Sequence, residues 1–137
     1  MQVDAIREFM RESFPQAKVD VLTVGNKGSM LRQEIDFSHL RPGGTVSGPT
    51  LMGLADAALY VAILGEIGLV ALAVTTNLNI NFLRKPAADR ALVAECRLIK
   101  LGKVLAVGEV YLYSEGSQEP VAHVTGTYSI PPKRDGN

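Results

Sequence analysis

A single carboxylate interrupts the longest apolar run of the chain. Residues 49–65 read PTLMGLADAALYVAILG, and Asp56 is the one charged side chain among them. The run is too long for a strand and does not alternate, which predicts a buried helix. Burial disfavours the charged form of a carboxyl group, so Asp56 must be hydrogen-bonded, neutralised or held in a wet crevice. Such carboxylates often serve chemistry, which makes Asp56 the first candidate catalytic residue.

The segment before this run could stabilise a developing negative charge. Residues 38–48 read SHLRPGGTVSG and lead directly into the predicted helix. Ser47 or Gly48 is suited to cap the helix, and Pro49 is suited to its first position. The backbone N–H of Gly48 would then lie unpaired at the positive end of the helix dipole, where it could polarise a carbonyl oxygen. A purely structural cap is the alternative for both Ser47 and Gly48.

Other reactive side chains form no recognisable constellation. The two histidines, His39 and His123, and the single cysteine, Cys96, match no metal-ligand spacing. One cysteine excludes an internal disulfide, and Cys96 lies in a strand-like run where a packing role is expected. No His–Asp pair stands at a recognisable spacing from Ser47. We therefore predict no metal and no cofactor.

Composition places the chain among ordinary soluble proteins. Its 137 residues predict one domain, and 47% of them are hydrophobic and 20% charged. The formal net charge of zero argues against a nucleic-acid partner and is compatible with self-association. The start of the chain is charged and amphipathic, without an apolar signal-peptide core, and the 49–65 run is short for a membrane span. We expect a cytoplasmic protein without a membrane partner.

Hydrophobic periodicity predicts an α+β architecture over residues 1–137. The helical spacing of apolar residues predicts an N-terminal helix that Pro15 ends, and alternation predicts the strands. The core spans about 17–131, followed by a flexible tail at 132–137. The predicted elements are helix 3–14, strands 17–24 and 30–37 with a turn at 25–28, helix 49–65, and strands 70–85, 90–101, 104–113 and 121–130. We expect these last strands to form an antiparallel meander, in one sheet wrapped around the 49–65 helix.

Two motifs resemble the hotdog-fold acyl-CoA thioesterases, specifically their PaaI-like branch. In that branch a loop with a Gly-Gly pair leads into a helix carrying Leu-Ala-Asp-x-Ala; here residues 44–49 read GTVSGP and residues 54–58 read LADAA. The next family motif is roughly Thr-x-x-Leu-x-Ile-x-Phe-Leu-Arg-Pro. Residues 75–86 read TTNLNINFLRKP, with one residue added before the proline. The resemblance covers roughly residues 20 to 130.

The resemblance implies hydrolysis of an acyl-CoA thioester to a free acid and CoA. Asp56 would be the general base on a water, or the nucleophile that forms a mixed anhydride. The Gly48 N–H would polarise the carbonyl, and Thr75 matches a Ser or Thr that positions the water. In related enzymes the acid and the glycine come from different subunits, which implies a homodimer, or a homotetramer built as a dimer of dimers.

Two departures from the family pattern concern substrate binding. Ser47 and Pro49 replace residues of the family's His-Gly-Gly, and Arg41 stands where many relatives have Asn. The candidate substrate-binding residues are Ser47, Arg41, His39, Asn79, Arg84 and Lys85, of which the last two could hold the phosphates of CoA. Each has a plainer alternative, namely a cap, an ordinary loop residue, a solvated turn or a polar strand face.

The sequence is also compatible with two other functions. The missing family His and Asn favour a non-catalytic module that binds or senses acyl-CoA. A hotdog hydratase or dehydratase is a third possibility, but it would pair an Asp with a nearby His, and His39 is not at a recognisable spacing from Asp56.

Overall fold

The computed structural model describes residues 3–13, 19–69 and 73–131. The predicted flexible tail at 132–137, the end of the first helix at Pro15 and the strand starts at 17–18 and 70–72 lie outside the described residues. The elements are α1 (Val3–Ser13), β1 (Asp20–Gly25), β2 (Gly28–Gln33), a short 3₁₀ helix η1 (Phe37–His39), α2 (Gly48–Ile67), β3 (Val74–Phe82), β4 (Leu92–Leu101), β5 (Leu105–Ser114) and β6 (Ala122–Ser129).

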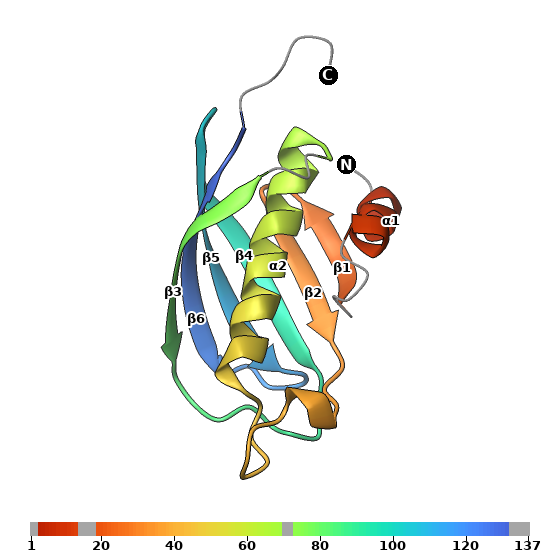
Figure 1. The fold of residues 1–137 in the computed structure, drawn as a ribbon, viewed down its shortest axis with the longest axis vertical. Coiled ribbons are helices and arrows are strands. Elements are labelled where there is room, and N and C mark those ends of the chain that lie inside the picture. The colour runs from red at the N-terminus through yellow and green to blue at the C-terminus, as the bar shows by residue number, and fades with distance from the viewer. Residues whose placement is uncertain (1–2, 14–18, 70–72, 132–137) are drawn as a thin grey trace.

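Helix α2 lies across one face of the curved sheet, and α1 packs beside β1 (Figure 1). Ser47 is the N-cap of α2, with the hydroxyl accepting a hydrogen bond from the backbone N–H of Thr50, and Pro49 lies in the first turn. The helix ends at Gly68, whose φ of 96° is accessible to glycine. Although α2 is long and apolar enough to span a membrane by composition, more than half of that segment is buried inside this protein.

The strands form one six-stranded antiparallel sheet in the order β1-β2-β4-β5-β6-β3. β4, β5 and β6 form the expected meander, but β3 pairs with β6 at the sheet edge and not with β4. The expectation of a four-strand meander is therefore wrong. Residues 83–91 cross from β3 to β4, so that β3 extends the wall around the apolar helix on the β6 side. The α+β hotdog fold, a sheet wrapped around one central helix, is confirmed.

Several strand limits differ from the sequence prediction. The strand predicted at 30–37 ends at Gln33, and η1 follows it. The two-residue turn predicted at Gly102 and Lys103 is a three-residue connection, because β5 begins at Leu105. The 25–28 turn is confirmed, with positive φ at Asn26 and Lys27, as a two-residue hairpin of this hand requires.

Two cross-strand glycines form the notch that receives the middle of α2. Gly108 of β5 pairs with Gly126 of β6, and both face Leu59. A Cβ placed on Gly126 would lie 2.5 Å from Leu59 Cδ1, and one on Gly108 would lie 2.7 Å from Leu59 Cδ2. Leu59 itself is almost fully buried. The absence of side chains at these two positions therefore sets how closely the helix approaches the sheet.

We expect Gly126→Ala to lower the free energy of unfolding by about 1–3 kcal/mol, because Leu59 must shift within a packed core. The measurement is urea unfolding followed by circular dichroism. Gly53→Ala is the matched control: a Cβ there meets nothing within 4 Å, and replacing an exposed helical glycine stabilises by about 0.5–1 kcal/mol. Equal stability of Gly126→Ala and the wild type would contradict this close approach.

Candidate functional site

Asp56 lies half-buried on the side of α2 that faces β3 and β6, and two hydroxyl groups donate hydrogen bonds to it. Thr75 Oγ1 donates to Asp56 Oδ1 over 2.6 Å, and the Tyr128 hydroxyl donates to the same oxygen over 2.7 Å. Of the three predicted environments for this carboxyl, hydrogen-bonded, neutralised or in a wet crevice, the structure shows the first. Among the described residues no donor contacts Oδ2, so the second oxygen is available to a water or a substrate.

A β-bulge directs Thr75 toward Asp56. Side chains alternate along a strand, so Thr75 and Leu78, three residues apart, would ordinarily lie on opposite faces. The register of β3 against β6 shifts between Thr75 and Asn77, with Thr75 opposite Tyr128 and Leu78 opposite Gly126. The extra residue at Thr76 places Thr75 on the same face as Leu78, which is the face that packs on α2.

Tyr128 is a site residue that the sequence analysis missed. It is 4% exposed on β6, and its ring stacks on that of Tyr60 with centroids 6.0 Å apart. Burial raises the pKa of Tyr128 well above its ordinary range, which keeps the hydroxyl protonated. A signal was present: Tyr128 falls on the inward face of an alternating strand, and a buried tyrosine hydroxyl needs a polar partner.

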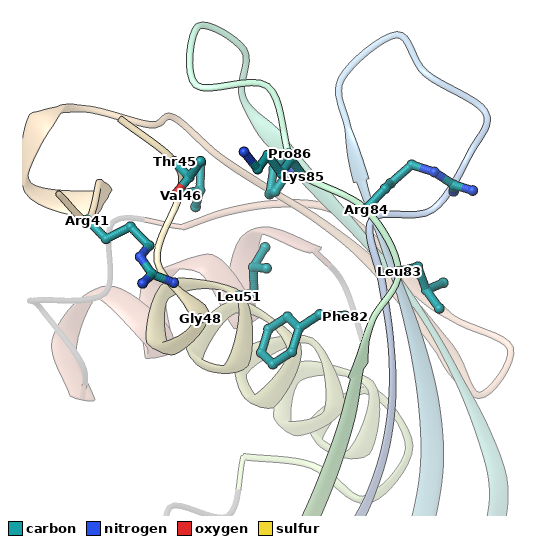
Figure 2. Close-up of a pocket in the computed structure, with 10 residues that line it drawn as sticks. All are labelled: Arg41, Thr45, Val46, Gly48, Leu51, Phe82, Leu83, Arg84, Lys85 and Pro86. Atoms are coloured by element: carbon teal, nitrogen blue, oxygen red, sulfur yellow. The ribbon is translucent and has the colours of Figure 1, made fainter. Parts of the chain in front are cut away.

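Gly48 lines a separate groove at the start of α2, with a volume of about 410 Å³ (Figure 2). The preceding loop turns back at Pro42 and Gly43, and the bridge between Leu40 and Val46 ties it down. As the first residue of the helix, Gly48 has an N–H without an intrahelical acceptor. The groove is lined by Arg41, Thr45, Val46, Gly48, Leu51, Phe82, Leu83, Arg84, Lys85 and Pro86.

Three of the predicted substrate-binding residues meet in this groove. Arg41 is directed toward the first turn of α2, whereas Arg84 is turned toward the loop before β6 (Figure 2). The Arg84 guanidinium donates to the carbonyl of Pro120 and lies 3.6 Å from Glu119. Within the described part of the chain the side chains of Arg41 and Lys85 have no ion-pair partner. They are therefore the cations best placed for an anionic ligand.

His39 and Ser47 stand apart from this groove. The His39 Nδ1 accepts a hydrogen bond from the backbone N–H of Asp36 over 2.9 Å, and the ring lines a second groove with Gln33 and Thr50. Its backbone carbonyl accepts from the N–H of Ser47 over 2.8 Å. His39 thus supports the helix cap through its backbone. The Ser47 hydroxyl caps the helix, which is the plainer of its two predicted roles.

The outer face of the sheet carries the remaining polar candidates. Asn79 pairs with Thr125 of β6 on the face opposite α2, and its amide donates to Asn77. His123, also on that face, lies 3.0 Å from Glu109. Within one protomer Asn79 therefore does not reach Asp56 or Gly48.

Within the described residues, Cys96 is buried and the histidines and acidic residues form no cluster of metal ligands. Cys96 is 4% exposed on β4, and its burial raises the pKa of the thiol to about 12. A thiol with so high a pKa is a poor nucleophile. Over residues 3–13, 19–69 and 73–131, no three His, Cys, Asp or Glu side chains group together as metal ligands.

The structure thus divides the predicted catalytic residues between two places. Asp56 and Thr75 meet where α2 faces β3, whereas Gly48 begins the same helix eight residues earlier, about 12 Å along its axis. Neither Asp56 nor Thr75 lines the groove of Gly48. Within one protomer, Gly48 and Asp56 are therefore too far apart to contact the same thioester group.

Comparisons with known proteins agree with this architecture. Residues 43–121 match the model of the thioesterase superfamily. Among solved structures, a candidate thioesterase from a Silicibacter species is 43% identical over 96% of this chain and 93% of that one, with a TM-score of 0.88. A mutant of the phenylacetic acid degradation protein PaaI from Thermus thermophilus is 26% identical over 90% and 99%, with a TM-score of 0.74. A search of curated proteins finds no match.

Proposed function

This chain belongs to the thioesterase superfamily and is a thioester hydrolase, and we propose that its substrate is an acyl-CoA, cleaved to a free acid and CoA. The observation that carries the proposal is the Asp56 carboxylate, which two hydroxyls hold through one oxygen while its other oxygen stays available. The groove beside Gly48 supports the choice of CoA, because it combines apolar walls with the cations of Arg41 and Lys85 at its rim.

In the proposed reaction, a water attacks the thioester carbonyl while Asp56 accepts its proton. The carbonyl oxygen becomes an oxyanion that the Gly48 N–H stabilises, with the positive end of the α2 dipole behind it. Collapse of this intermediate breaks the C–S bond, and the CoA thiolate leaves and takes the proton that Asp56 accepted from the water, which returns Asp56 to its carboxylate form. Alternatively, the carboxylate attacks the thioester carbonyl directly, expels the CoA thiolate and forms a mixed anhydride. Water then cleaves the anhydride and regenerates Asp56, so this route uses the same residues.

We propose that two protomers complete each site. Within the described residues β3 pairs on one side only, with β6, and its exposed edge includes the apolar side chains of Val74 and Phe82. Antiparallel pairing of two copies of this nine-residue strand about its middle residue would place the Phe82 end of one copy beside the Val74 end of the other. Phe82 lines the Gly48 groove, and Val74 precedes Thr75. The pairing would therefore bring Gly48 of one copy near Asp56 of the other, and it would cover an edge that is otherwise prone to aggregation.

The decisive experiment is a panel of short, long and aromatic acyl-CoA esters, with CoA release followed by a thiol reagent. We expect CoA to be released from at least one class of ester, together with an equimolar acid. Tight binding without CoA release would favour the non-catalytic module. A change in enoyl absorbance without CoA release would favour the hydratase or dehydratase.

We expect the double variant Arg41→Gln/Lys85→Gln to raise KM for acyl-CoA about tenfold, because each of these cations would meet a CoA phosphate at the groove rim. The KM for the matching acyl-pantetheine, which lacks the nucleotide, should not change. Lys103→Gln, in the exposed β4–β5 connection, is the matched control. An equal rise of KM for both substrates would show that Arg41 and Lys85 do not bind the nucleotide part of CoA.

A further inference from the structure

We propose that Tyr128 is a positioning residue for Asp56: its hydroxyl, with that of Thr75, fixes Oδ1 and leaves Oδ2 as the oxygen that reacts. This inference rests on the proposed function and assigns a role to a residue that the two sequence motifs do not contain. Tyr128 reaches Asp56 from the last strand, 72 residues further along the chain.

The geometry identifies which bond the phenol makes. The Tyr128 oxygen lies 2.7 Å from Asp56 Oδ1 and 3.1 Å from the Asp56 backbone carbonyl. A phenol has one proton to donate, so the shorter contact, to the charged oxygen, is the stronger bond. The longer contact holds the phenol against the helix backbone as well. Tyr128 is thereby bound to both the backbone and the side chain of the residue it orients.

Occupation of Oδ1 determines the role of Oδ2. Thr75 and Tyr128 both donate to Oδ1, and a carboxylate oxygen has two lone pairs to accept them. Oδ2 is then the oxygen that most readily accepts a proton from water or forms a bond to the substrate carbon. The two hydroxyls also fix the rotation of the carboxylate, so that Oδ2 is aimed before the substrate arrives.

The phenol is itself held rigidly. It is buried, its ring stacks on Tyr60 of α2, and it pairs across the sheet with Thr75 at the bulge. Within one protomer β6 is bonded on both sides, to β5 and β3, so the strand that carries Tyr128 is fixed before any second protomer pairs with β3.

The test is Tyr128→Phe, which removes only the hydroxyl and keeps the stacked ring. We expect kcat to fall by about 10²-fold with KM nearly unchanged, since misplacement of a catalytic group affects the chemical step more than binding. Tyr113→Phe, at a half-buried position on the outer face, is the matched control and should keep the wild-type kcat. In an Asp56→Asn background, Tyr128→Phe should lower the residual rate no further.

A second measurement tests the contact between Tyr128 and Asp56 independently of catalysis. The unfolding free energies of Tyr128→Phe, Asp56→Ala and the double variant form a cycle, and we expect clear coupling between the two positions. A purely structural role would lower stability and leave the kcat of the folded enzyme unchanged, which would overturn the inference. Absence of coupling would overturn it as well. If the wild type hydrolyses no acyl-CoA, the proposed function fails, while the cycle still reports whether Tyr128 holds Asp56.

Discussion

Asp56→Asn should lower kcat for acyl-CoA hydrolysis by about 10²- to 10⁴-fold, with KM close to that of the wild type. The amide oxygen can still accept the hydrogen bonds of Thr75 and Tyr128, so the local geometry is kept. What is lost is the second carboxylate oxygen, which would take the proton of the water or attack the carbonyl. Steady-state CoA release over a range of substrate concentrations separates kcat from KM.

The matched control for this variant is Glu66→Gln. Glu66 is an exposed carboxylate on the same helix, and it accepts a hydrogen bond from the backbone N–H of Lys27, far from Asp56. We expect it to keep the wild-type kcat. Thermal unfolding of both variants checks that they are folded. Wild-type turnover by a folded Asp56→Asn enzyme would show that another group performs the chemistry.

An equimolar mixture of two inactive variants, Asp56→Asn and Gly48→Pro, should regain roughly one quarter of the wild-type activity after subunit exchange. Gly48→Pro removes the N–H of a residue at a helix start, where proline is tolerated. Loss of one such donor costs about 10²- to 10³-fold in kcat. If each site takes Gly48 from one protomer and Asp56 from the other, random pairing leaves both residues intact at about a quarter of the sites.

A second mixture serves as the control. Asp56 and Thr75 lie in the same protomer, so Asp56→Asn mixed with Thr75→Val should regain nothing. Native mass spectrometry of tagged subunits confirms that exchange has taken place. Restored activity in both mixtures, or in neither, would show that the site is not divided between protomers at Gly48 and Asp56.

Local features of this protein were predicted from the sequence because they depend on neighbours in the chain. The central helix, its cap at Ser47 and the turn at Asn26 and Lys27 follow from apolar spacing, hydrogen-bonding side chains and backbone preferences within a few residues. The same reasoning identified Asp56, since one charge in an apolar helix requires a partner. It did not identify Tyr128 as one of the two partners, because no periodicity connects a helix to a strand 72 residues away.

The strand order and the bulge depend on contacts between distant segments, so only the tertiary structure reveals them. Alternation predicts a strand over 70–85, which the structure shows at Val74–Phe82. It does not predict that this strand pairs with β6 and not with β4, which depends on how the sheet closes around the helix. Perfect alternation would also turn Thr75 away from Asp56, and only the extra residue at Thr76 brings it back.

The sequence by itself determined the α+β architecture and the central helix that carries Asp56 and begins beside Gly48. Only the tertiary structure turned Arg84 toward Glu119 and placed the Tyr128 hydroxyl against the Asp56 carboxylate. The physical reason is that helices, caps and turns form through interactions over a few residues. The contacts that orient a catalytic group form between distant segments, and burial of the apolar helix brings those segments together.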